Sequence, residues 1–223
     1  MSVIDAARGP KLQTYNPGNL ANDMGAWITA GDSTITFDQA EDGPGIDFGT
    51  DSTDNDCATM AAAGEVVPVA TTGSNYGFEA VFMHTEGSTS AANWFIGFSD
   101  VTGSTFFGDT GALATMDAIG IYKVESSLFF RTCALNATAQ SGETTTTAYA
   151  SATQYRIRVD ARTYADGVTI KFYVNEVLID TVTGFTATAM TAMQPVVAVA
   201  NGAGAAETLT LRQFVPYANA LAA

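Results

Sequence analysis

Residues 154–180, QYRIRVDARTYADGVTIKFYVNEVLID, contain the clearest structural pattern in this chain of 223 residues. Apolar side chains occupy every second position on both sides of the turn sequence ADG: Tyr155, Ile157, Val159, Val168, Ile170, Phe172 and Val174. A period of two is typical of strands with one buried face, so the stretch predicts an antiparallel hairpin. A second tight turn is expected at Asn175-Glu176, followed by another strand over residues 177–182.

Similar short patterns, separated by turn sequences, occur through most of the chain. Residues 93–99, NWFIGFS, are almost all apolar, which predicts a central strand covered on both faces. In residues 118–124 the alternation puts Lys123 on the same face as Ile119 and Ile121. Further strands are expected at residues 26–29, 34–38, 77–84, 128–133, 194–200 and 207–215.

This spacing predicts an all-β fold in which two antiparallel sheets pack as a jelly-roll sandwich. The count is about twelve strands, and no segment shows the periodicity of an amphipathic helix. The sequence ATMAAA at residues 58–63 favours a short helical turn. We expect the following side chains in the core: Phe82, Phe95, Ile157, Val159, Ile170 and Phe172.

The ends and loops suggest one β-sandwich domain, residues 26–223, preceded by an extended N-terminal arm, residues 1–25. The arm contains Pro10 and Pro17 among polar residues, so regular structure is not expected there. Residues 41–56, rich in Gly and Asp, predict a long polar loop. The Thr-rich residues 139–153 form either an edge strand or a mobile loop.

The net charge of −14 disfavours binding to nucleic acid or to an anionic membrane, because phosphate recognition requires clustered Lys and Arg. Residues 12–122 contain no Lys or Arg and 15 Asp and Glu. This acidic segment serves solubility or attracts a basic partner surface. No secretory signal and no stretch of apolar residues long enough to span a bilayer is visible, so we expect a chain made in a cytoplasm. Cys57 and Cys133 are expected to be buried free thiols, with a disulfide between them as the alternative.

The sequence predicts neither catalytic residues nor a cofactor. His84 is the only histidine, and a lone histidine at the end of an apolar strand is typical of a hydrogen-bonded structural residue. No GxSxG sequence accompanies it, and the His and Cys residues are too dispersed for zinc. The paired carboxylates of a glycosidase are not recognisable either. We therefore expect a protein that is not an enzyme.

Two groups of residues are candidates for binding. Asp51, Asp54 and Asp56 gather oxygen ligands of the kind calcium prefers, but their spacing does not fit an EF-hand loop, so no metal is expected. Phe106 and Phe107 are adjacent aromatic residues in a Gly, Ser and Thr-rich loop. Because both rings cannot easily point inward, one is a candidate anchor for a partner protein, and packing within the loop is the alternative.

Four segments resemble the concanavalin A-like, or laminin G-like, jelly-roll family: NWFIGFSD at 93–100, YRIRVD at 155–160, GVTIKFYVNEVLIDT at 167–181 and LTLRQFVPYA at 209–218. The resemblance covers residues 75–217 and is specific for fold rather than function. The sequence departs from the family pattern at Glu176, where the family often has a Gly that eases a positive φ.

Within that family, the chain is similar to virion proteins of tailed bacteriophages, in particular capsid decoration (cement) proteins. This resemblance implies a structural protein on the capsid exterior, made in the host cytoplasm. Its partners would be the major capsid protein and copies of itself, as a dimer or trimer. Arg8, Lys11 and Tyr15 of the arm, with Phe106 and Phe107, are the implied partner-binding residues. The alternative is a lectin-like, glycan-binding module of a phage fibre or surface protein.

Overall fold

The computed structural model describes residues 11–12, 27–30, 34–38, 45–50, 57–62, 72–87, 92–103, 106–107, 111, 113–137, 139–141, 144–187, 190, 193–202 and 206–219. These residues form sixteen strands in two antiparallel sheets of eight strands each, and they include no helix. No helix long and apolar enough to cross a membrane is therefore found in this part of the chain.

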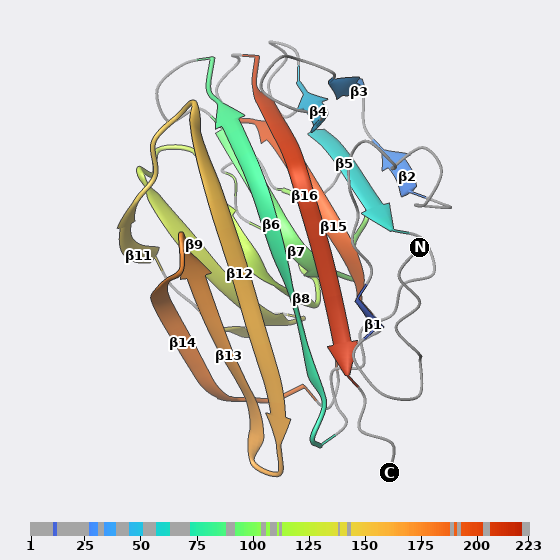
Figure 1. Cartoon of the computed structure of the whole chain (residues 1–223), viewed down its shortest axis with the longest axis vertical. Coiled ribbons are helices and arrows are strands. Elements are labelled where there is room, and N and C mark those ends of the chain that lie inside the picture. The colour runs from blue at the N-terminus through green and yellow to red at the C-terminus, as the bar shows by residue number, and fades with distance from the viewer. Residues whose placement is uncertain are drawn as a thin grey trace.

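Sheet A has the strand order β14-β13-β12-β6-β16-β4-β3, and β1 also pairs with β16. Its strands are β1 (Lys11–Leu12), β3 (Thr34–Asp38), β4 (Gly45–Gly49), β6 (Asn75–Thr85), β12 (Thr153–Tyr164), β13 (Gly167–Val174), β14 (Val177–Phe185) and β16 (Thr208–Asn219). In Figure 1 the strands β12, β6 and β16 of this sheet lie toward the viewer.

Sheet B has the order β10-β9-β8-β7-β15-β5-β2, and β11 also pairs with β9. Its strands are β2 (Trp27–Ala30), β5 (Cys57–Ala62), β7 (Ala92–Ser99), β8 (Ala118–Lys123), β9 (Phe129–Asn136), β10 (Ala139–Ser141), β11 (Thr144–Ala148) and β15 (Gln194–Asn201).

The main core lies between the two sheets and is built largely from aromatic side chains. Phe78 of sheet A meets the edge of Phe98 of sheet B, with ring centroids 5.5 Å apart. Phe82 packs against Trp94 across the same space at 4.9 Å. Because aromatic side chains bury large areas, these contacts supply much of the attraction that holds the sheets together.

A second apolar layer covers the outer face of sheet B. Phe95 of β7 lies on that face, and Phe106 from the segment after β7 packs on it with ring centroids 4.8 Å apart. All eight residues of β7 are buried as a result. The prediction that residues 93–99 form a strand covered on both faces is thus confirmed.

The two-sheet sandwich predicted from the alternation is confirmed, and so are most of its details. The predicted core side chains are fully buried, although Phe95 belongs to the second layer instead of the space between the sheets. Both cysteines are buried free thiols. The predicted edge strand at residues 139–153 corresponds to β10 and β11, which lie at the edge of sheet B.

Four expectations about elements were wrong. Residues 57–62 form β5 and not a helical turn, because the small side chains fit between β2 and β15 and pairing overrides the helix propensity of alanine. The predicted polar loop contains β4, whose Ile46 and Phe48 are fully buried. Within the arm, Lys11 and Leu12 form β1 by pairing with Ala218 and Tyr217. The described residues hold sixteen strands, more than the twelve expected.

Candidate functional site

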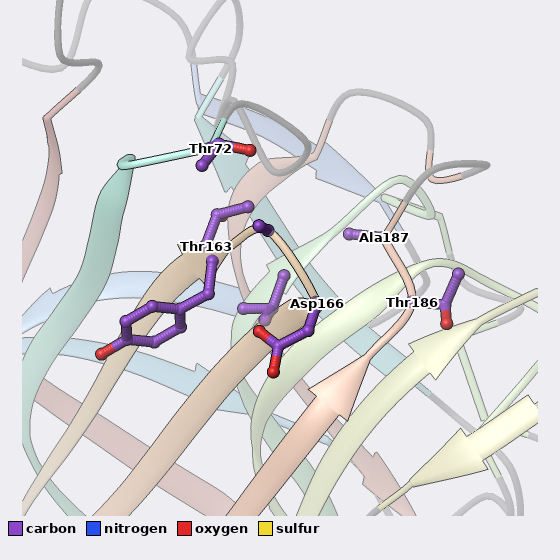
Figure 2. A pocket seen from close by; sticks show the side chains of 9 residues that line it. Thr72, Thr163, Asp166, Thr186 and Ala187 are labelled. Carbon is purple, nitrogen blue, oxygen red and sulfur yellow. The ribbon is translucent and has the colours of Figure 1, made fainter.

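A cleft of about 300 Å³ opens where the sandwich ends at the turn between β12 and β13. In Figure 2, Thr72 and Thr163 lie on one side of the cleft and Thr186 and Ala187 on the other, with Asp166 between them. The remaining lining residues belong to the same hairpin: Tyr164, Ala165, Gly167 and Val168. The described lining therefore combines three threonine hydroxyls, one carboxylate and one phenol ring with its own hydroxyl.

The hairpin geometry places these side chains at the mouth of the cleft. Ala165 and Asp166 form the turn, and Gly167 follows it with a φ of +129°, which a residue with a side chain rarely adopts. A Cβ atom at Gly167 would lie 2.8 Å from the backbone of Gly184 in β14. The glycine thus lets β13 and β14 approach closely beside the cleft.

The polar groups of the cleft are largely open to a ligand. Asp166, Thr72 and Thr186 are exposed, and 43% of Tyr164 is accessible to solvent. Among the described residues, the carboxylate of Asp166 has neither a hydrogen-bond partner nor an ion-pair partner. Arg162 lies over the ring of Tyr164, with its guanidinium carbon 5.2 Å from the ring centroid. An exposed carboxylate with hydroxyl groups and an aromatic face can bind a small polyhydroxylated ring.

A second polar group, the buried cluster, lies at the opposite end of β6 and β12, inside the sandwich. It contains His84, Glu86, Lys123, Tyr149 and Glu207. Lys123 Nζ lies 2.6 Å from Glu86 Oε1 and donates a hydrogen bond to the carbonyl of Ala92 at 3.1 Å. The side chains of Lys123 and Glu86 are 0% and 5% exposed, so this ion pair is excluded from solvent.

His84 is held as a neutral ring within the buried cluster. The hydroxyl of Tyr149 donates to the carbonyl of His84 at 3.1 Å, and His84 Nδ1 lies 2.6 Å from the same hydroxyl. Since a hydroxyl has one proton to donate, Nδ1–H is the donor in the shorter contact. His84 Nε2 then faces Glu207 Oε2 at 3.5 Å.

Burial sets the protonation states of the buried cluster. Desolvation lowers the pKa of His84 from 6.5 to about 3, although Glu86 opposes this shift. Desolvation also raises the pKa of Glu207 from 4.5 to about 7, while a hydrogen bond from the amide of Gly87 opposes it. The pKa of Lys123 is lowered by burial, against the hydrogen bond with Glu86. All of these groups lie inside the domain, so the cluster connects strands instead of presenting a reactive surface.

The candidate residues from the sequence are not brought together in one site. Asp51, Asp54 and Asp56 lie outside the described residues, as do Arg8 and Tyr15. The structure describes Lys11 only through the backbone pairing of β1 with β16. Within the described part of the chain, no three His, Cys, Asp or Glu side chains are grouped as metal ligands would be.

Phe106 and Phe107 differ in exposure. Phe106 is fully buried against Phe95, so this ring packs inside the domain and the expectation that it contacts a partner is not supported. Phe107 is half-buried on Phe106, with ring centroids 5.2 Å apart. Phe106 thus packs within the domain, as in the alternative to partner binding. A partner-binding role for Phe107 stays a prediction.

The residues of the cleft were not identified as a site from the sequence. Asp166 was part of the turn sequence ADG, and Tyr164 continued the polar face of a strand. Nothing in the local sequence shows that Thr72 approaches this turn, because it comes from a segment distant along the chain. Thr186 follows β14, which is longer than the strand expected over residues 177–182. The one available signal was a polar turn with an adjacent tyrosine, which is common in β-hairpins.

No protein-family model matches the sequence, and neither does any curated protein sequence. Solved structures do match by fold. Peanut lectin superimposes with a TM-score of 0.71 and 10% identity, over 96% of this chain and 100% of the lectin. The carbohydrate recognition domain of Emp47p gives 0.59 and 12%, covering 86% of this chain and 88% of that domain. A mutant of alginate lyase Aly36B in complex with alginate trisaccharide gives 0.57 and 12%, covering 92% of each chain. At these identities the likeness shows the fold alone, a lectin-like jelly-roll sandwich.

Proposed function

We propose that this protein is a lectin-like binding module that recognises a glycan at the cleft beside the β12–β13 turn. The observation that carries the proposal is the combination of the Asp166 carboxylate, the Thr72 and Thr186 hydroxyls and the exposed ring of Tyr164 around one small cleft. A carboxylate accepts hydrogen bonds from sugar hydroxyls, threonine hydroxyls donate and accept, and an aromatic face packs on the apolar face of a sugar ring.

The residues of the cleft support a proposal of binding without catalysis. Among the described residues that line the cleft, Asp166 is the only carboxylate, whereas hydrolysis of a glycosidic bond usually requires two. His84, the one histidine of the chain, is fully buried at the other end of β6 and does not line the cleft. The lectin-like fold is compatible with either activity, so the composition of the cleft is the basis for preferring binding.

The proposal is tested by screening the protein on a glycan array and measuring the affinity of hits by calorimetry. Asp166→Asn and Tyr164→Ala should each weaken binding at least tenfold, since each removes a main contact of the cleft. Glu176→Gln, an exposed carboxylate in the next turn, and Phe129→Ala, an aromatic residue with 41% exposure, are matched controls that should bind normally. An array without hits, or hits insensitive to both cleft substitutions, would refute glycan binding at this site.

Virion decoration, which the sequence resemblance implied, stays a prediction. The structures named above include no capsid protein, and Arg8 and Tyr15 lie outside the described residues. The pairing of β1 with β16 attaches the backbone of Lys11 and Leu12 to sheet A of the same chain. A pull-down against purified capsids, with and without residues 1–10, tests that role separately from glycan binding, because the deletion leaves β1 and the cleft intact.

A further inference from the structure

Four of the nine Lys and Arg residues of this acidic protein lie on the hairpin that forms the cleft: Arg156, Arg158, Arg162 and Lys171. The alternation of β12 and β13 puts them on the outer face of sheet A, because the intervening residues Ile157, Val159, Ile170 and Phe172 fill the core. This outer face therefore holds four of the basic residues of a chain whose net charge is −14, together with the carboxylates of Glu79, Asp160 and Glu176.

The two arginines farther from the cleft are already paired. Arg156 Nη2 lies 2.7 Å from Glu79 Oε1, and Arg156 Nη1 lies 3.2 Å from Glu176 Oε1. Arg158 Nη1 lies 2.7 Å from Asp160 Oδ2, and the guanidinium of Arg158 also stacks over the ring of Tyr173 at 4.0 Å. These contacts neutralise both charges and fix both side chains, so neither arginine is free to bind an anion strongly.

Arg162 and Lys171 are different. Both are exposed, and within the described part of the chain neither has a carboxylate oxygen within 4.0 Å. Arg162 faces Thr169 across the β12–β13 ladder. Lys171, two residues farther along β13 on the same face, lies opposite Asp160, whose carboxylate pairs with Arg158. Diagonal neighbours of this kind lie about 7–8 Å apart, a separation that long side chains can bridge.

The two unpaired cations adjoin the cleft through Tyr164. Tyr164 lines the cleft, and the guanidinium of Arg162 lies over its ring at 5.2 Å. A sugar ring held in the cleft against Tyr164 therefore has a guanidinium beside it, and an ammonium group one position farther along the sheet. Asp166, at the turn, repels negative charge from the cleft itself, so an acidic substituent of the ligand would be directed toward Arg162.

We infer that the glycan bound by this module is an anionic polysaccharide. This inference rests on the proposed glycan-binding function and names its ligand class. One sugar occupies the cleft with its hydroxyls toward Asp166, and the carboxylate or sulfate of that sugar or of the next lies against Arg162 and Lys171. Nucleic acid is disfavoured, because a phosphate backbone needs many cations in a row and the net charge of −14 repels it over the remaining surface.

The test compares polymers that differ only in charge. Oligogalacturonate is paired with its methyl-esterified form, and a sulfated galactan with its desulfated form, so that the two arms distinguish carboxylate from sulfate recognition. We expect the charged member of at least one pair to bind about tenfold to a hundredfold more tightly, with an affinity that falls as salt is added. The variant Arg162→Gln/Lys171→Gln should lose this preference, and Arg156→Gln, a paired arginine on the same strand, should retain it.

The outcomes separate the inference from the proposed function. The inference of an anionic ligand is refuted if neutral glycans bind as well as charged ones, or if Arg162→Gln/Lys171→Gln keeps the preference for the charged polymer. Glycan binding at the cleft is then still tested separately by Asp166→Asn. If no polymer binds in any arm and the glycan array has no hits, the proposed function fails and this inference fails with it. Both substituted side chains are on the surface, so the variants should fold normally. Circular dichroism of each variant checks that a lost affinity does not reflect unfolding.

Discussion

Lys123 Nζ and Glu86 Oε1 form an ion pair at 2.6 Å between the two sheets, where almost no solvent reaches either side chain. Transfer of two charges out of water is unfavourable, and their mutual attraction and the hydrogen bond to Ala92 offset that cost only while both partners are present. Removal of one partner leaves an uncompensated charge in the interior.

Lys123→Met should therefore lower the free energy of unfolding by about 3–5 kcal/mol, because Glu86 loses its counter-charge. Urea denaturation followed by tryptophan fluorescence measures the effect. The double variant Lys123→Met/Glu86→Gln should regain part of the loss, since it removes the isolated charge. Lys171→Met, an exposed lysine on sheet A, is the matched control and should change stability by less than about 0.5 kcal/mol. A single variant as stable as the wild type would contradict this account.

The pH dependence of stability should show two opposing contributions from the buried cluster. The pKa of His84 falls from 6.5 to about 3 on folding, so the unfolded chain binds more protons and this contribution to stability is lost as pH falls below about 6.5. The pKa of Glu207 rises from 4.5 to about 7, so the folded chain binds more protons and stability decreases as pH rises from about 4.5 to 7.

Denaturation midpoints between pH 4 and pH 8 distinguish the two contributions. Glu207→Gln should gain stability relative to the wild type as pH increases through this range, because the variant cannot ionise. His84→Gln should lose less stability than the wild type between pH 6 and pH 4. Equal pH profiles for the wild type and Glu207→Gln would show that Glu207 does not titrate as stated. Tyr149, Lys123 and Glu86 also face His84 and Glu207. The denaturation midpoints of Lys123→Met over the same pH range therefore show how far the charge of Lys123 affects the two titrations.

The alternation of single strands predicted that Lys123 shares a face with Ile119 and Ile121, and the structure shows that this face is buried. It could not identify Glu86 as the partner of Lys123, because Glu86 follows β6 of sheet A and Lys123 ends β8 of sheet B, so the two residues meet only after the sheets pack. A similar reason hid the cleft, where Thr72 joins a hairpin that is distant from it in sequence. Strand β5 was missed because alanine favours helices in isolation, whereas the neighbouring strands decide its conformation.

The turn between β13 and β14 contains a residue that strains the backbone. Asn175 and Glu176 have φ values of 48° and 65°, the left-handed pair that a two-residue hairpin turn requires. Asparagine tolerates this region, but glutamate does not do so readily. Glu176→Gly should raise the free energy of unfolding by about 1 kcal/mol, as a higher melting temperature would show.

Glu176→Ala is the control for that gain. It removes the same carboxylate, which lies 3.2 Å from Arg156 and is 57% exposed, but it keeps a Cβ atom in the left-handed conformation. Exposed ion pairs contribute little to stability, so Glu176→Ala should have nearly the wild-type melting temperature. If both variants gain equally, the effect comes from the carboxylate and the strain argument is wrong.

The outer face of sheet B depends on two glycines that face each other across β7 and β8, Gly97 and Gly120. The ring of Phe95 occupies the space that their side chains would fill: a Cβ atom at Gly120 would lie 2.7 Å from two atoms of that ring. It would also lie 2.7 Å from the carbonyl oxygen of Ile96, which belongs to the backbone of the sheet. Movement of the ring alone therefore cannot make room.

Gly120→Ala should consequently destabilise the protein by about 1–3 kcal/mol, the usual range for an extra methyl group in a close-packed interior. Phe95 must move as well, which loosens its contact with Phe106, so the segment after β7 should exchange its amide hydrogens faster in the variant. Hydrogen exchange measured by mass spectrometry would report that change separately from global stability. Gly103→Ala is the matched control and should leave both measurements unchanged, because a Cβ atom there meets none of the described residues within 4 Å. A Gly120→Ala variant with normal stability and normal exchange would mean that the strands separate slightly at no cost, and the second apolar layer would then not be close-packed.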